Sequence, residues 1–335
     1  MTRRLFGTLP DGTPVEALTL TGGGLTAEVL TLGAIVRDLR MDGHAAPLVL
    51  GFDRLEDYLA HSRNHGASVG RFAGRIAEGR YTLDGTTVEL EINEARRGNT
   101  LHGGAEGIGK RVWQVESLAA DRMTLSIRDP DGQAGFPGNV DVLAHILLKN
   151  GALRIAYESR TDAPSPVNIA HHGYFNLDGS ADILSHRIRI DAPRYLPIRE
   201  SVAPTGEVAP VAGTPFDLQQ LTAIGPRMAE GGVAFDHCFC LSDAAEPARI
   251  VARVESPGGI AMDVATTEPG LVFFAAAPID IPVPGLEGRR YGPSAGLCLE
   301  AQIWPDAVNH PGWPESVLRP GQVRVQETHY IFSRP

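Results

Sequence analysis

The chain has 335 residues, of which 43% are hydrophobic and 21% are charged, so it can bury a sizeable core as a globular protein. Its formal net charge of −10 at pH 7 is repelled by nucleic-acid phosphates and by anionic lipid surfaces, so we expect neither a nucleic-acid nor a membrane partner. The cysteines Cys238, Cys240 and Cys298 make no disulfide framework, and no apolar signal segment follows Arg3-Arg4. These observations predict a cytoplasmic protein.

Short segments that alternate between apolar and polar residues recur along the chain, separated by turns rich in glycine and proline. Helical periodicity is scarce, and no linker or repeat interrupts the pattern. We therefore predict an all-β fold, one large antiparallel β-sandwich, with residues 1–335 as a single domain. In chain order the pattern predicts a short helix at 55–60, a hairpin at 81–90, strands at 123–127, 142–148, 153–157 and 188–190, part of a helix within 219–229, and strands at 250–254 and 262–264.

Two motifs that would indicate other chemistry lack the context they need. Residues 104–111 resemble a phosphate-binding loop, but Arg111 replaces the serine or threonine that would bind magnesium, and no βαβ pattern surrounds it. His171 and His172 are adjacent and would point to opposite faces of a strand, which makes them a poor metal pair. The sequence also lacks an HExxH motif, so we predict no metal site.

Two other segments carry groups that suit proton transfer. Residues 171–177 place His172 and Tyr174 on a short β-like run, and imidazole titrates near neutral pH. Residues 297–306 place the carboxylate of Glu300 within an otherwise apolar strand. Together they suggest an acid and a base on a rigid sheet, although a core histidine and an edge-strand glutamate remain the simpler interpretation of each one alone.

Strand alternation places Glu300, Gln302 and Trp304 on one face, whereas residues 297, 299, 301 and 303 are apolar and would face the core. A carboxylate, a carboxamide and an indole side by side suit a sugar. The polar groups can hydrogen-bond hydroxyls, and the indole can stack on C–H bonds. A solvated sheet face that happens to carry a tryptophan is an equally weighted alternative.

Further candidates come from three separate segments. His102 lies in a glycine-rich turn, where the backbone can approach a ligand closely. Arg71 and Arg75 are four residues apart and would face the same way in an extended chain, so one could clamp hydroxyls and either could form a structural salt bridge. Asp236 is a lone carboxylate among apolar residues, which must be paired or functional, and one of these arginines could pair with it.

Taken together and in this order, the segments resemble the aldose 1-epimerase (galactose mutarotase) family over nearly the whole chain. Each segment is a weak signal alone, and their joint order makes the resemblance specific. It implies a large antiparallel β-supersandwich, in agreement with the strand pattern. The matching segments are residues 70–76, 99–104, 172–177, 204–207, 213–217, 235–237, 299–302, 305–307 and 318–321.

The resemblance also implies roles for individual residues. Glu300 would be the general base and His172 the general acid, while His102 would assist at the ring oxygen of a sugar. It further implies contacts to the sugar from three other residues of these segments, namely Arg75, Asp236 and Tyr174.

The implied reaction is the interconversion of the α and β anomers of a free aldose. The anomeric carbon is a hemiacetal, so the reaction breaks no C–H bond and needs no cofactor. The scheme uses an ionised Glu300 beside a protonated His172, whose opposite charges favour each other, and it predicts a bell-shaped pH–rate profile. The preferred aldose stays open, because Gly74 stands where many relatives have asparagine and residues 271–274 are apolar where some present a polar side chain.

Two alternatives use the same scaffold. A hexose-6-phosphate epimerase would need an additional cationic pocket for the phosphate. A non-catalytic sugar-binding or sensor protein would not need an acid–base pair. In each case the partner is a small monosaccharide, and we expect a monomer or a homodimer.

Overall fold

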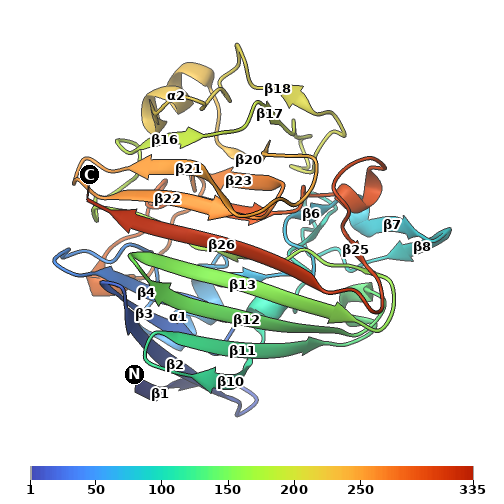
Figure 1. Cartoon of the computed structure of the whole chain (residues 1–335), viewed down its shortest axis with the longest axis horizontal. Helices are drawn as coiled ribbons and strands as arrows, with labels where there is room; N and C mark the ends of the chain where they lie inside the picture. The colour runs from blue at the N-terminus through green and yellow to red at the C-terminus, as the bar shows by residue number, and fades with distance from the viewer. Residues whose placement is uncertain (1, 335) are drawn as a thin grey trace.

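The computed structural model describes residues 2–334, which fold mainly into β-strands (Figure 1). The ladders of its large sheets are antiparallel, as the alternating pattern predicts. The predicted all-β fold is therefore confirmed.

A nine-stranded sheet forms the broadest layer of the molecule, with β26 and β13 side by side near its middle (Figure 1). Its strands alternate between buried and partly exposed residues, so that one face packs on the core. In spatial order the strands are β10 (Gln114–Leu118), β11 (Arg122–Asp129), β12 (Val140–Lys149), β13 (Ala152–Thr161), β26 (Arg324–Ser333), β22 (Ala261–Thr266), β21 (Arg249–Glu255), β16 (Arg187–Ile190) and β19 (Thr222–Ala223).

Two smaller sheets pack against the inner face of this layer. Ala27 of the four-stranded sheet, Val142 of β12 and Leu299 of the five-stranded sheet belong to one continuous apolar core. The four-stranded sheet consists of β1 (Thr2–Thr8), β2 (Pro14–Gly22), β3 (Leu25–Leu30) and β4 (Ile35–Met41). The five-stranded sheet consists of β18 (Ala209–Pro210), β17 (Arg194–Tyr195), β20 (Asp236–Cys240), β23 (Gly270–Phe274) and β24 (Cys298–Gln302).

Short ladders and helices connect these layers. No helix within residues 2–334 has the length and apolar character that a membrane crossing requires. The two-stranded ladders are β5 (Ala67–Val69) with β15 (Ala170–His172), β6 (Arg75–Ile76) with β9 (Thr100–Leu101), β7 (Arg80–Leu83) with β8 (Thr86–Glu89), and β14 (Ser165–Pro166) with β25 (Val317–Leu318). The α-helices are α1 (Leu55–His61) and α2 (Ile224–Gly231), and the 3₁₀ turns are η1 (Ala77–Gly79), η2 (Ile108–Lys110), η3 (Gln133–Gly135), η4 (Leu286–Gly288) and η5 (Ala307–Asn309).

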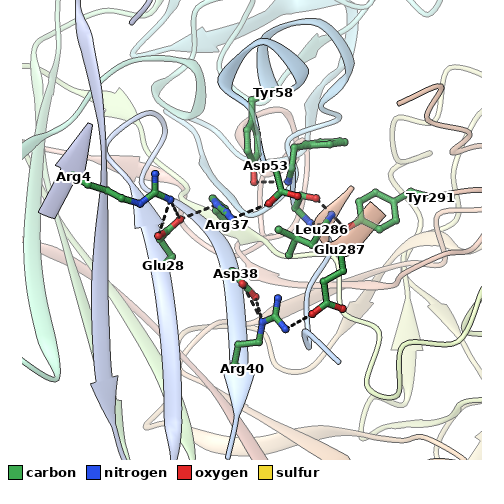
Figure 2. Close-up of polar contacts among 12 residues, drawn as sticks. Arg4, Glu28, Arg37, Asp38, Arg40, Asp53, Tyr58, Leu286, Glu287 and Tyr291 are labelled. Atoms are coloured by element: carbon green, nitrogen blue, oxygen red, sulfur yellow. Dashed lines mark hydrogen bonds and ion pairs between the residues drawn. The ribbon is translucent and has the colours of Figure 1, made fainter. Parts of the chain in front are cut away.

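A chain of polar contacts fastens the four-stranded sheet to the segments around α1 and η4 (Figure 2). Arg37 of β4 donates from Nε to Glu28 of β3 at 2.8 Å and from Nη2 to Asp53 at 3.2 Å. The Tyr291 hydroxyl donates to the carbonyl of Gly51 at 2.9 Å. These contacts hold the chain that leads into α1 against the sheet.

Most predicted elements are present, and two differ for physical reasons. The predicted helix near residue 55 and the 81–90 hairpin are confirmed as α1 and β7–β8. The helix within 219–229 begins only at Ile224, because residues 222–223 pair with β16 as β19. The regular alternation predicted for 250–254 is wrong, since a bulge after Ile250 leaves that residue half exposed and buries both Val251 and Ala252.

Candidate active site

The ladder of β15 with β5 separates the two adjacent histidines, as predicted. His171 points into the core, where its ring lies 5.7 Å from the ring of Tyr330. His172 points the other way, and its Nε2 lies 3.5 Å from Oε1 of Glu300 on β24. The structure thus brings the predicted acid and base together from segments that are far apart in the sequence.

His102 lies beside this pair. It follows β9 with a φ of +52°, and its Nδ1 accepts a hydrogen bond from the backbone N–H of Gly74 at 3.1 Å. Its ring centroid lies 5.3 Å from that of His172, at an interplanar angle of 79°. A neutral imidazole that accepts at Nδ1 carries its proton on Nε2, so His102 can donate a hydrogen bond to a ligand.

His102, His172 and Glu300 also form a set that could hold a metal ion. One ligand atom from each side chain lies within 4.8 Å of the others. Two imidazole nitrogens and a carboxylate oxygen suit a divalent transition metal. The same three groups are the ones to which the family resemblance assigns catalytic roles.

Burial governs the charge state of these side chains. It raises the pKa of Glu300 to about 8, with the nearby Asp236 adding to the rise and Arg75 opposing it. Burial lowers the pKa of His172 to about 4 and holds the pKa of His102 well below its usual value. The neutral pair is therefore favoured over the ion pair that the reaction scheme uses. Desolvation of both groups outweighs their attraction across 3.5 Å.

Arg75 and Asp236 lie next to this trio. The guanidinium of Arg75 donates to both carboxylate oxygens of Glu94, at 2.8 and 3.1 Å, and its Nη1 lies 3.5 Å from Oδ2 of Asp236. The predicted pairing of Asp236 with one of the two arginines is confirmed. Glu94 was not identified from the sequence, because a glutamate in a polar segment is not distinguished from its neighbours. Glu94 also contacts the 99–104 segment, since the amide of Asn99 donates a hydrogen bond to its carboxylate at 3.2 Å.

Arg71 does not share this environment, so the expectation that the two arginines face the same way is wrong. Its side chain is fully buried and donates to Asp129 at 2.7 Å. It also donates to four backbone carbonyls, those of Asp129, Pro130, Pro137 and Gly138. The chain between the two arginines is not extended, since Gly74 has a φ of +75°. Arg71 is therefore a structural hub.

The ring of Tyr174 packs against the imidazole of His172. Its ring stacks on His172 with centroids 5.1 Å apart and on His65 with centroids 4.2 Å apart. Its hydroxyl donates to the carbonyl of Arg63 at 2.8 Å. Tyr174 thus lies at the site, as predicted, and its hydroxyl is bonded to the backbone of Arg63. His65 was not identified from the sequence, where a single histidine outside any motif gives no signal.

Gln302 ends β24 with a carboxamide that is fully buried. Within residues 2–334 neither its Oε1 nor its Nε2 has a hydrogen-bond partner, which is unusual for a buried carboxamide. The backbone of Gly74 approaches it closely, and a Cβ at that position would lie 3.0 Å from Nε2 of Gln302. This crowding and the positive φ explain why Gly74 carries no side chain here.

Trp304 lies beyond the end of β24, in a different environment from Glu300. Its indole N–H donates to the carbonyl of Pro269 at 2.9 Å, and its ring packs edge-on against Trp313 at 5.3 Å. Ile303 belongs to the same apolar cluster, so the alternation predicted through residue 304 is wrong after Gln302. The position of Trp304 gives no support to stacking on a sugar.

Comparisons with known proteins identify the family of this chain. The sequence profile of the aldose 1-epimerase family matches residues 16–331. The chain is 40% identical over 341 residues to galactose mutarotase from Bos taurus, covering 99% of this chain and 98% of that protein. It is 35% identical over 340 residues to aldose 1-epimerase from Escherichia coli strain K12, covering 96% of each. Its fold matches the crystal structure of a GalM/aldose epimerase homologue from C. elegans with a TM-score of 0.89 at 27% identity, covering 95% of this chain and 98% of that one. The chain therefore belongs to the aldose 1-epimerase family of isomerases.

Proposed function

We propose that the protein interconverts the α and β anomers of a free aldose by opening and closing the sugar ring. The observation that carries this proposal is the 3.5 Å approach of His172 Nε2 to Glu300 Oε1 in a buried site that also holds the imidazole of His102. The names of the relatives, galactose mutarotase and aldose 1-epimerase, support the same reaction class.

Ring opening requires two proton transfers. Glu300 takes the proton of the anomeric hydroxyl, while His172 gives a proton to the ring oxygen. The bond between the anomeric carbon and the ring oxygen breaks, and the anomeric carbon becomes an aldehyde. Rotation about the adjacent C–C bond exposes the other face of the aldehyde, and the ring closes with the two roles reversed. His102, with its proton on Nε2, donates a hydrogen bond to the ring oxygen.

The charge state of the site favours the direction of these transfers. Ring opening leaves a protonated Glu300 and a neutral His172, which is the state that burial favours through a Glu300 pKa of about 8 and a His172 pKa of about 4. The pair therefore has the same charge state beside the open-chain intermediate as it has at rest, with Glu300 protonated and His172 neutral. The bound cyclic sugar must first favour the ion pair, which its hydroxyls can do by hydrogen-bonding the carboxylate.

Binding of the sugar is assigned to the polar groups around this pair. Arg75 and Asp236, 3.5 Å apart, offer a donor and an acceptor to sugar hydroxyls, and the unpartnered carboxamide of Gln302 offers both. Tyr174 fixes the ring of His172 by stacking. We assign Trp304 to the packing of the adjoining wall, because its N–H is already bonded to Pro269.

Polarimetry of freshly dissolved sugars tests the proposed reaction. We expect the protein to accelerate the change in optical rotation of α-D-glucose or α-D-galactose without consuming either sugar. Pentoses and glucose 6-phosphate extend the panel and define the substrate class. Turnover restricted to the phosphorylated sugar, or calorimetric binding of a sugar without any turnover, would contradict the proposal.

A further inference from the structure

Asn168 lies behind the site, on the segment that leads into β15, and its side chain is fully buried. Its Nδ2 donates to the carbonyl of Ala73 at 3.1 Å and to the carbonyl of Ile303 at 3.2 Å. Its Oδ1 accepts from the backbone N–H of Ile303 at 2.9 Å and from Nε2 of Gln326 at 3.2 Å. The hydrogen-bonding capacity of this carboxamide is therefore fully used, by groups from three other segments.

The backbone groups that Asn168 bonds belong to the neighbours of site residues. Ala73 precedes Gly74 and Arg75, and Ile303 follows the last residue of β24, the strand that carries Glu300. The backbone of Asn168 adds two further bonds, one on each side of Phe72. Its N–H donates to Arg71 O at 2.8 Å, and its carbonyl accepts from Ala73 N–H at 2.7 Å. Asn168 thus joins the segment that carries Arg75 to the segment that carries Glu300. His172 lies four residues further along the segment of Asn168 itself.

A second buried amide fixes the orientation of this one. Gln326 of β26 also donates from Nε2 to Glu268 at 2.7 Å, and its Oε1 accepts from the backbone N–H of Ile169 at 2.8 Å. The N–H of Ile169 and that of Ile303 each define an acceptor oxygen, so both carboxamides have a single consistent orientation. The chain from Glu268 through Gln326 to Asn168 connects the central strand of the nine-stranded sheet to the site.

We propose that Asn168 is a positioning residue that sets the distance and angle between His172, Glu300 and Arg75 without contacting the sugar. The expected effect of Asn168 on the rate rests on the proposed function. Its expected effect on the geometry of the acid–base pair does not depend on that function. A displacement of about 1 Å in such a pair can lower the rate by roughly 100-fold. The hydrogen bonds of Asn168, which hold the backbone of the flanking segments in place, should therefore affect the rate.

The test compares Asn168→Leu with Asn176→Leu. Asn176 is a matched control, because it is also buried and its Nδ2 also bonds two backbone carbonyls, those of Ser180 at 2.9 Å and Ala295 at 2.8 Å. Both variants should lose thermal stability. Only Asn168→Leu should lower kcat, by about 10- to 100-fold, with its pH–rate limbs displaced. Asn168→Ser, which keeps a hydroxyl, serves if the leucine variant does not fold.

NMR titration of the His172 imidazole gives a readout that does not depend on turnover. Burial lowers the pKa of His172, so we expect that pKa to rise in the Asn168 variant, where a displaced imidazole loses part of its burial, and to stay unchanged in the Asn176 variant. An unchanged His172 pKa in the Asn168 variant, or a kcat equal to that of the Asn176 variant, would overturn the positioning role. A wild-type protein without mutarotase activity would instead overturn the proposed function, and the NMR comparison would still decide this inference.

Discussion

The protonation states of Glu300 and His172 depend more on their burial than on the attraction between their charges. Glu300 and His172 are both almost fully buried, and each is pushed toward its neutral form. Between the two pKa values, about 4 and about 8, the pair holds one proton. Ring opening needs that single proton, whichever partner carries it at rest, because one group must donate while the other accepts.

The pH–rate profile follows from this proton count. We expect kcat/KM to form a bell, falling in acid as the pair gains a second proton and falling in base as it loses its only one. The limbs lie near the macroscopic pKa values of about 4 and about 8. Polarimetric rates across this range check the prediction, and a profile that is flat through both limbs would contradict it.

The raised pKa of Glu300 also predicts a pH dependence of stability. A group whose folded pKa lies above its unfolded value stabilises the fold fully below the unfolded pKa, here 4.5, and that contribution is lost as the pH rises through about 8. Glu300→Gln cannot ionise. The free energy of unfolding of the wild type should therefore decline relative to that of the variant as the pH rises from about 5 to about 9. Urea denaturation of both proteins measures this difference, and a constant difference across the range would argue against a buried neutral Glu300.

Residue types, strand alternation and the family resemblance together predicted much of this site. His172, Glu300, His102, Arg75, Asp236 and Gln302 were each identified from the sequence, and the structure brings them together. The resting charge state was not predictable, because it depends on desolvation in the folded protein. Trp304 was misplaced because strand alternation carries no information about where a strand ends.

At the element scale, Arg71 joins parts of the chain that no ladder connects. Its guanidinium bonds Asp129 at the end of β11 and carbonyls of the following loop, with 0% of its side chain exposed. The sequence allowed either a clamp for hydroxyls or a salt bridge for this arginine, and only the fold could decide. The turn at Gly74 separates it from Arg75, and a turn of this kind is not visible in the spacing of two charges.

Removal of this guanidinium should destabilise the protein strongly. Arg71→Met leaves a buried carboxylate and several carbonyls unpaired, so we expect a loss of about 3–5 kcal/mol in the free energy of unfolding. Arg128 is the matched control, because it pairs with Asp141 with 59% and 60% of the two side chains exposed. Arg128→Met should cost less than about 1 kcal/mol. Equal losses in chemical denaturation would show that Arg71 is not a structural hub.

At the scale of the whole molecule, the site lies where short ladders meet the five-stranded sheet, while the nine-stranded sheet supplies the core behind it. The alternating pattern predicted this architecture, since it reports which face of each strand is buried. It does not report how separate ladders are placed relative to one another, so Glu94, His65 and Asn168 were not identified. A single domain over residues 1–335, a cytoplasmic location, and a monomer or homodimer stay predictions.

The reaction chemistry predicts independence from added metal. Anomer interconversion breaks and re-forms one C–O bond through two proton transfers that side chains can carry out, so we expect kcat and KM to be unchanged after dialysis against EDTA. Metal analysis of the dialysed protein provides the control. A loss of activity that Zn²⁺ restores would instead mean that His102, His172 and Glu300 hold a required ion.

The central claim is that Glu300 and His172 form the acid–base pair of a mutarotase. Polarimetry of α-D-galactose and α-D-glucose with Glu300→Gln, His172→Asn and the control His171→Gln tests it most directly, with circular dichroism confirming that each variant is folded. We predict that the first two variants lower kcat/KM by at least about 100-fold, while the control, whose ring packs on Tyr330 on the opposite face, retains most of its activity. Near-wild-type rates in a folded Glu300→Gln or His172→Asn variant would contradict the account.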